Sequence, residues 1–219
     1  MNTKLDTLNG ADWQRMFINA ATSVAAHVDE LTALDNATGD GDHGVNVTRA
    51  FEHLRLQVEE LENPTPSAVL TTAAESFSNE MGGAAGALFG SFFQAAARSV
   101  SGLDEVNATR FADAIESGAD NVTMRGKANI GDKTMVDALI PAAKASRVAA
   151  SDGRSTARAL RMTAQAARQG AEATTAMAAS IGRARFSGEK ARGVQDPGAT
   201  TVALIFEAWA DACAERDET

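Results

Sequence analysis

The 219-residue sequence has no tyrosine, four prolines and a single cysteine, Cys213. One cysteine excludes an internal disulfide framework and suits a reducing compartment, so we expect a cytoplasmic protein. The net charge of −9 excludes the basic surface that nucleic acids and anionic membranes require. Residues 1–30 contain no apolar core of a signal peptide, and no later run reads as a membrane span. We therefore expect neither a nucleic-acid nor a membrane partner.

Alanine is the commonest residue of the chain and has the highest helix propensity. The alternating β-branched pattern that marks strands is absent from the sequence. At 219 residues the chain can bury one substantial core, and neither an internal repeat nor a linker divides it. We therefore predict an all-α fold in a single domain over residues 1–219.

Apolar residues at three- and four-residue spacing mark the helices. The clearest stripe predicts a helix that ends before Pro64, and it consists of Val47, Phe51, Leu54, Val58 and Leu61. The same spacing predicts further helices near residues 3–31, 67–80, 84–101, 107–124, 134–149, 155–180 and 198–215, which makes eight in all. The segment 181–198 is too rich in glycine and basic residues for a helix interior, and loops of this length are usually functional or disordered.

Asp35, Asp40 and Asp42, the aspartate trio, lie in the glycine-rich stretch LDNATGDGDHGVN and are the most informative feature of the sequence. Two like charges about 4 Å apart repel by about 4 kcal/mol at an effective dielectric constant of about 20. A hard divalent cation would relieve this repulsion, and carboxylate oxygens are the ligands that Mg²⁺ or Ca²⁺ prefers. The alternative interpretation is a solvated acidic turn.

Three known loop motifs match the chain only in part. The glycines of residues 39–44 have dinucleotide-binding spacing, but no strand is predicted before them, and the aspartates would repel a bare pyrophosphate. An EF-hand loop beginning at Asp40 would need an oxygen ligand and a glutamate where the chain has Gly44 and Phe51. Residues 126–134, GKANIGDKT, resemble a P-loop, yet a helix is predicted before them. We reject all three, and the features that remain suit a phosphate bound through a metal.

Two helix starts and two arginines suit such a phosphate. His43–Asn46 open the helix after the trio, and free N–H groups at a helix N-terminus attract anions. Residues 82–86, GGAAG, begin another helix, although a glycine pair before a helix is usually an ordinary turn. Arg183 and Arg185 could neutralise phosphate charge, although loop arginines are usually solvated. From the residues alone, His43 is a candidate general base, metal ligand or helix cap.

Four separated segments together resemble the nucleotide-binding L subunit of dihydroxyacetone kinases, the DhaL family. They are LDNATGDGDHGVN, GGAAGALFGSFF, RGKANIGDKTMVDALIP and GRARFSGEKARGVQDPGATT, and they extend over roughly residues 34–201. Four motifs in the same order are far more specific than any one of them.

The resemblance implies a barrel of eight antiparallel helices with ADP or ATP bound at one end. By the same resemblance, two Mg²⁺ ions would be held by Asp35, Asp40 and Asp42 and would bind the nucleotide phosphates. Arg183 would assist phosphoryl transfer as the catalytic residue, and the 181–198 loop would cap the nucleotide. The positions that would contact the nucleotide are His43, Gly44, Val45, Asn46, Ala84, Ala85, Gly126, Met135, Arg183, Asp196, Pro197 and Gly198.

One position departs from the family pattern. The family usually has GGASG where this chain has GGAAG, so Ala85 replaces a serine whose hydroxyl helps to hold a phosphate. A hydrogen bond to a charged group contributes about 1.5–3 kcal/mol, so its absence implies weaker nucleotide retention or an altered donor preference.

The resemblance also implies partners. In the family a K subunit holds the ketose through a histidine, and in some systems a phosphohistidine carrier subunit, charged from phosphoenolpyruvate, recharges the bound ADP; in others ATP exchanges. The ketose would be dihydroxyacetone or a relative such as erythrulose. Two alternatives stay open: a non-catalytic Mg-ADP-binding regulatory module of the same fold, and a metal-dependent hydrolase that uses the carboxylates directly. Alanine-rich helical faces could also pack between subunits in a homo-oligomer.

Overall fold

The computed structural model describes residues 5–217, and for residues 187–190 and 215–217 it describes the backbone alone. Within this part of the chain almost all regular structure is helical, and each of the two strands has three residues. The predicted all-α, single-domain fold is confirmed. The ends of the predicted domain, residues 1–4 and 218–219, lie outside the described residues. Within the described part, every helix is too short or too polar to cross a membrane.

The elements follow one another along the chain in a simple order. They are β1 (Thr7–Asn9), α1 (Gly10–Ala26), α2 (Val28–Thr38), α3 (His43–Glu59), α4 (Pro66–Ser76), the π-helix η1 (Phe77–Met81), α5 (Gly83–Ser99), β2 (Glu105–Asn107), α6 (Ala108–Gly126), α7 (Val136–Ser151), α8 (Thr156–Ala173), the 3₁₀ helices η2 (Thr174–Ala176) and η3 (Ala184–Ala191), and α9 (Pro197–Asp217). β1 and β2 pair antiparallel, with Leu8 opposite Val106.

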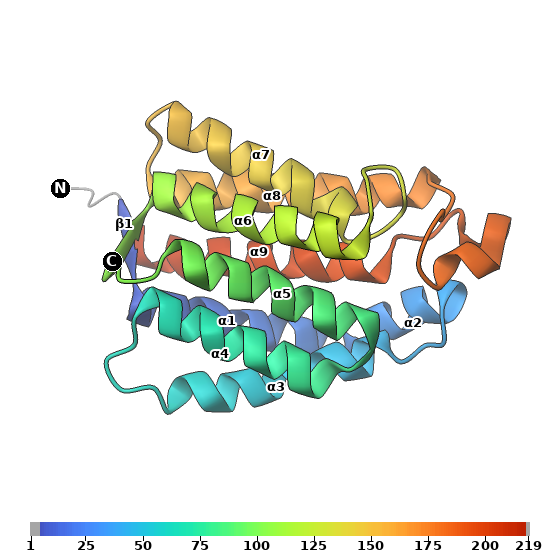
Figure 1. Cartoon of the computed structure of the whole chain (residues 1–219), viewed down its shortest axis with the longest axis horizontal. Coiled ribbons are helices and arrows are strands. Elements are labelled where there is room, and N and C mark those ends of the chain that lie inside the picture. The colour runs from blue at the N-terminus through green and yellow to red at the C-terminus, as the bar shows by residue number, and fades with distance from the viewer. Residues whose placement is uncertain (1–4, 218–219) are drawn as a thin grey trace.

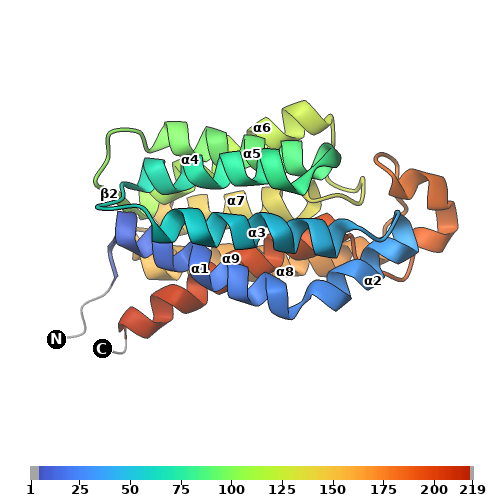
Figure 2. The same ribbon diagram turned by 90° about the horizontal axis from the view of Figure 1, so that it is seen from below.

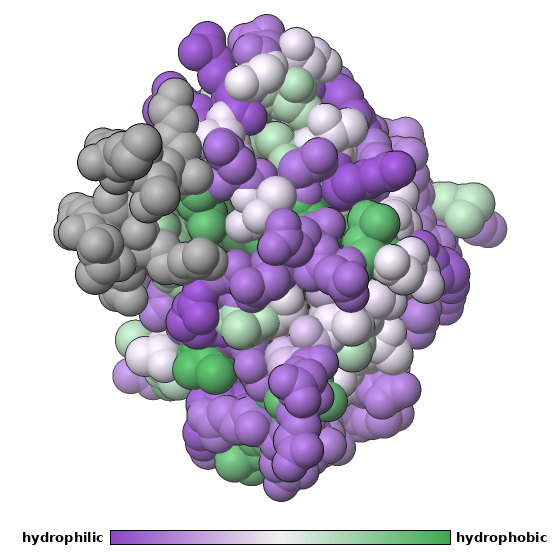
Figure 3. Space-filling model, turned by 90° about the vertical axis from the view of Figure 1, so that its left-hand side faces the viewer, coloured by the Kyte–Doolittle hydropathy of each residue, from purple (hydrophilic) through white to green (hydrophobic). Residues whose placement is uncertain are grey.

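The long helices lie side by side along one direction (Figures 1 and 2). Their contacts form a closed series from α1 through α3, α4, α5, α6, α7 and α8 to α9, which packs back against α1. A barrel of eight helices requires such a series, and the barrel remains our interpretation of it. The strands and both ends of the chain lie at one end of the molecule, where mostly hydrophilic side chains surround scattered apolar ones (Figure 3). α2 and η3 contact each other at the opposite end.

Side-chain caps fix where several helices begin. Asn9, Thr65, Asn107 and Ser155 each precede a helix, and each accepts a hydrogen bond from the backbone N–H three residues later. Such caps satisfy N–H groups that have no partner inside the helix. The polar residues that interrupt the apolar pattern therefore determine the starts of α1, α4, α6 and α8.

An aromatic cluster fills the centre of the core. Trp13 of α1 meets Trp209 of α9 edge to face, with ring centroids 5.3 Å apart and an interplanar angle of 78°. Phe17 and Phe206 also contact Trp209 edge to face, at 5.2 and 5.3 Å. Edge-to-face pairs are favourable because the positive rim of one ring meets the negative face of the other. The cluster joins the first and last helices of the series.

The helix predicted near residues 3–31 is wrong in two respects, and its first residues, 3 and 4, lie outside the described part. The chain first forms β1, and α1 ends at Ala26, because the backbone of His27 leaves the helical region at φ −111° and ψ 15°. A second helix, α2, then continues to Thr38, so Asp35 lies in a helix and not in the predicted loop. The apolar spacing continues across the break, so periodicity alone could not reveal it.

Two other predicted helices end earlier than expected. The helix predicted over 155–180 stops at Ala173 and passes through η2 into irregular chain from Met177. The helix predicted over 67–80 changes from α to π geometry at Phe77. The non-α segment predicted at 181–198 is present, although it contains η3, and α9 already begins at Pro197.

Candidate metal and nucleotide site

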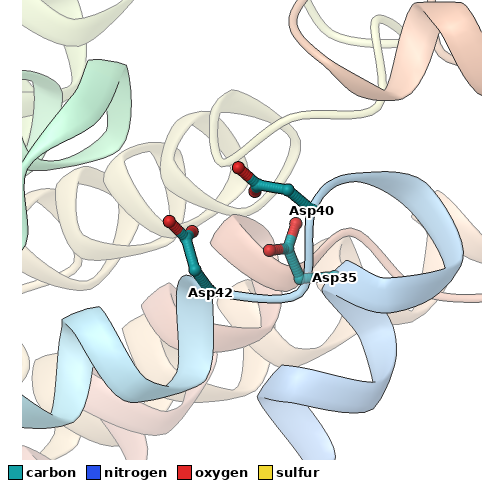
Figure 4. A group of neighbouring side chains, drawn as sticks. All are labelled: Asp35, Asp40 and Asp42. Carbon is teal, nitrogen blue, oxygen red and sulfur yellow. The ribbon is translucent and has the colours of Figure 1, made fainter.

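The aspartate trio comes together at the end of the molecule opposite the chain termini (Figures 1 and 4). Asp35 extends from the last turn of α2, Asp40 lies in the following loop, and Asp42 immediately precedes α3. Figure 4 shows their carboxylates converging on one space, and one oxygen from each lies within 4.8 Å of the others. Three anionic oxygens so close together fit a hard divalent cation such as Mg²⁺.

The loop of the trio needs glycine at two positions. Gly41 has φ of +79°, in the left-handed region, and a Cβ atom there would lie 2.1 Å from Oδ1 of Asn36. A Cβ atom on Gly39 would lie 2.3 Å from Oδ1 of Asp35. Glycine at these positions lets the backbone fold back over the end of α2 and brings Asp40 and Asp42 next to Asp35.

His43 joins the trio to the start of α9. Its backbone N–H donates to Oδ2 of Asp35 at 3.1 Å, and its Nε2 lies 2.9 Å from Oγ1 of Thr201. Because the Thr201 hydroxyl donates its only proton to the carbonyl oxygen of Pro197, it accepts a hydrogen bond from His43 Nε2. Burial lowers the pKa of His43, although Asp35 and Asp42 oppose this shift. The His43 side chain thus connects the start of α3 to α9, and α3 begins without a side-chain cap.

Arg183 also reaches the trio. It lies immediately before η3 and forms an ion pair with Oδ2 of Asp40, in the loop after α2. The side chains of Arg183 and Asp40 are 63% and 51% exposed, so the pair is open to solvent. Arg185, the other candidate of this segment, lies over the ring of Phe186, 4.5 Å from its centroid. Of the two arginines, Arg183 is therefore the one in contact with the site.

The second glycine motif forms a turn before α5. Gly82 and Gly83 have φ of 69° and 60°, a region that disfavours other residues. Ala84 and Ala85 lie in the first turn of α5, where backbone N–H groups lack partners within the helix. Arg49 of α3 connects the end of η1, just before this turn, to the start of α3, because it donates to the carbonyl of Glu80 at 3.0 Å and to Oδ1 of Asn46 at 3.1 Å.

The remaining predicted nucleotide residues lie at the same end of the molecule. Met135 and Gly198 adjoin, since a Cβ atom on Gly198 would lie 3.4 Å from Cβ of Met135 and 3.1 Å from Oδ2 of Asp196. Asp196 accepts a hydrogen bond from the N–H of Ala199 at 2.7 Å, but desolvation dominates and raises its pKa to about 7. Gly126 ends α6, and Val45 is 55% exposed in α3.

Lys133 is a residue of this region that the sequence did not single out as functional. It is 1% exposed and lies beneath the segment that carries Arg183. Desolvation lowers its pKa, against the attraction of Asp196 and Asp137. In the sequence, Lys133 is part of the rejected P-loop match GKANIGDKT, and no apolar periodicity there indicates a buried lysine.

Residues 37–211 match the family described as the DAK2 domain. The chain belongs to the DAK2 domain family. This DAK2 chain is 35% identical to the PEP-dependent dihydroxyacetone kinase, ADP-binding subunit DhaL, of Escherichia coli (strain K12), over 84% of this chain and 88% of that protein. It is 38% identical to the PEP-dependent dihydroxyacetone kinase 2, ADP-binding subunit DhaL, of Listeria innocua, over 81% of this chain and 83% of that protein.

A solved structure shares the fold of this DAK2 chain. The dihydroxyacetone kinase of C. freundii, crystallised in complex with AMP-PNP and Mg²⁺, superposes with a TM-score of 0.71 over 96% of this chain at 24% identity. The chain spans 36% of that kinase, so it corresponds to one part of a longer protein. The likeness shows that the two proteins share a fold over this part.

Proposed function

We propose that this DAK2 chain is the nucleotide-binding phosphotransfer subunit of a kinase for dihydroxyacetone or a related ketose. It would hold Mg-ADP or Mg-ATP and pass the phosphoryl group to a ketose that is bound by a partner K subunit. The observation that carries the proposal is the convergence of Asp35, Asp40 and Asp42 within 4.8 Å of one another at the start of α3. Relatives of similar length are named as ADP-binding subunits, which supports the same conclusion.

Each part of the site has a distinct task in this proposal. The aspartate trio would hold two Mg²⁺ ions, and bound Mg²⁺ supplies charge neutralisation at phosphate oxygens. The N–H groups that begin α3 and α5 would orient the phosphates. Met135 and Asp196–Gly198 would line the nucleotide. Arg183, already paired with Asp40, would add positive charge where the phosphoryl group leaves. Phosphoryl transfer depends mainly on such positioning and charge neutralisation.

The division of labour with a partner gives a direct experiment. Purified chain should bind Mg-ADP but phosphorylate no dihydroxyacetone by itself, and activity should appear when a ketose-binding K subunit is added. A coupled kinase assay with candidate K subunits measures this. Phosphorylation of dihydroxyacetone by the chain alone would contradict the division of labour.

The same assay distinguishes the phosphoryl donors. If ADP stays bound and is recharged, activity requires phosphoenolpyruvate, the phosphotransferase proteins and a phosphohistidine carrier subunit. If nucleotide exchanges, ATP alone supports turnover. We propose the first route, because both similar subunits named above belong to PEP-dependent kinases.

One residue favours a second candidate function, a regulatory module that binds Mg-ADP without catalysis. Ala85 in the first turn of α5 has no hydroxyl to hold a phosphate. The two functions are distinguished by the assay above, since a regulatory module would bind Mg-ADP yet give no activity with any K subunit and either donor.

A further inference from the structure

The segment that carries Arg183 leaves the helical bundle at Thr174 and returns to it at Val194. Between these residues lie the irregular chain from Met177 and the 3₁₀ helix η3. We call residues 175–193 the arginine segment. Its two ends lie close together, because the N–H of Gly193 donates to the carbonyl of Thr175 at 2.9 Å.

One side chain bonds to the backbone at both ends of the arginine segment. Nζ of Lys133 donates to the carbonyl of Thr174 at 2.5 Å and to the carbonyl of Val194 at 2.6 Å. An amino group carries several donors and can satisfy two carbonyl oxygens at once, which an apolar side chain of the same length cannot. Without Lys133, both carbonyl groups would lose a partner, that of Thr174 in a buried place and that of Val194 in a partly buried one.

The environment of Lys133 indicates that its amino group is required there. Burying a lysine is unfavourable unless its donors are used, and Lys133 is 1% exposed. Its backbone has φ of +61°, a region that favours glycine or asparagine, yet the chain has a lysine there. The hydrogen bond from the N–H of Asp196 to Oγ1 of Thr174, 2.8 Å long, strengthens the same junction.

We propose that Lys133 is a positioning residue that closes the base of the arginine segment and thereby places Arg183 against Asp40. It acts through the backbone of Thr174 and Val194 and touches neither nucleotide nor metal. The segment is also tied to the bundle by Ser180, whose N–H and hydroxyl donate to Asp132. The junction at Lys133 holds the two ends of the segment together, and this keeps Arg183 at the trio. The effect on nucleotide rests on the proposed function, whereas closure of the segment does not.

Limited trypsin digestion tests closure without any ligand. Within the segment trypsin cleaves after Arg183, Arg185, Lys190 and Arg192, and mass spectrometry locates each cut. Lys133→Met keeps the length of the side chain and removes its donors, so cleavage at these bonds should become at least about tenfold faster, as expected when buried carbonyl groups lose their partners. Leu160→Ala, in the core of α8, is the matched control, because it destabilises the fold through a cavity and leaves both ends of the segment in place.

Calorimetric titration of Mg-ADP tests the link to Arg183. Lys133→Met should weaken binding about tenfold in the wild-type background and at most about twofold in the Arg183→Ala background, because coupled residues are not additive. The proposal is overturned by unchanged cleavage in Lys133→Met, by equal acceleration in Leu160→Ala, or by the same loss of affinity in both backgrounds. If wild-type chain binds no Mg-ADP, the proposed function fails, and the digestion still decides whether Lys133 closes the segment.

Discussion

Arg183 forms an ion pair with Asp40, and so brings a positive charge from the segment before α9 onto the acidic loop after α2. The trio thus has one source of charge compensation in the protein itself, a cation at one carboxylate, and the proposed function adds a divalent metal at all three. In the proposed function both would relieve the same repulsion. The arginine and the metal would then compete for Asp40 until phosphate oxygens accept hydrogen bonds from the guanidinium.

The competition predicts opposite effects of Arg183→Ala on two ligands. Mn²⁺ alone should bind up to about fivefold more tightly, since an exposed ion pair contributes only about 0–1 kcal/mol. Mg-ADP should bind about tenfold or more weakly, because a hydrogen bond to a charged group is lost. Calorimetry measures both, with Arg185→Ala as the neighbouring control. If Arg183→Ala moves both affinities in the same direction, the pairing has no role at the site.

The members of the trio should respond differently to substitution. Asp40→Asn or Asp42→Asn should abolish Mg²⁺-dependent ADP binding and leave the melting temperature unchanged or slightly higher, because apo-state repulsion falls. Unchanged ADP affinity in either variant would rule out the metal assignment.

Asp35→Ala should also destabilise the fold. Asp35 is 8% exposed and accepts the buried N–H of His43, and an unpaired buried donor costs about 1–3 kcal/mol. For a domain of this size, each kcal/mol lowers the melting temperature by about 2–4 °C. Thermal unfolding monitored by circular dichroism measures the melting temperatures of both variants. Equal melting temperatures for Asp35→Ala and Asp40→Asn would contradict the prediction.

Restoring the family serine should tighten nucleotide binding. Ala85→Ser adds a hydroxyl in the first turn of α5, where a phosphate hydrogen bond of about 1.5–3 kcal/mol would raise the affinity for Mg-ADP about 10- to 100-fold. Ala87→Ser, an exposed position of the same helix, is the control. Equal affinities of the two serine variants would mean that the start of α5 does not face the phosphates.

The raised pKa of Asp196, about 7 against the usual 3.8, predicts a pH dependence. Between these values the folded chain binds the proton and the unfolded chain does not, so the stability contribution falls as the pH rises through this window. Asp196→Asn keeps an acceptor for Ala199 and removes the titration. Relative to wild type, the free energy of unfolding of the variant should therefore rise from pH 5 to pH 8, by up to about 1.4 kcal/mol per pH unit below pH 7. Urea unfolding at pH 5 and pH 8 measures the free energy of unfolding of both proteins. If the variant differs from wild type by the same amount at the two pH values, the prediction is wrong.

Local signals in the sequence predicted most of the helices and the acidic loop. Helices such as α5 and α6 begin within one residue of their predicted starts, because a glycine turn or an asparagine cap coincides with the apolar stripe. The aspartates were recognisable because like charges this close in sequence need compensation wherever the loop lies.

What the sequence could not reveal depends on contacts between distant residues. Periodicity carried the predicted helix of 155–180 past Ala173, but Lys133 holds the carbonyl of Thr174 at a point where the chain leaves the helix. The bond between His43 and Thr201 is equally invisible, since the two residues lie at the starts of α3 and α9. Neither contact leaves a local pattern.

The central claim is that the aspartate trio binds Mg²⁺ and that the metal retains the nucleotide. Calorimetric titration of the wild-type chain with ADP, once in Mg²⁺ and once in excess EDTA, tests it most directly. We predict saturable binding with Mg²⁺ and a loss of at least about 100-fold in EDTA, because without the metal the trio repels the phosphates. Equal affinity in the two buffers, or no binding in either, would contradict the claim.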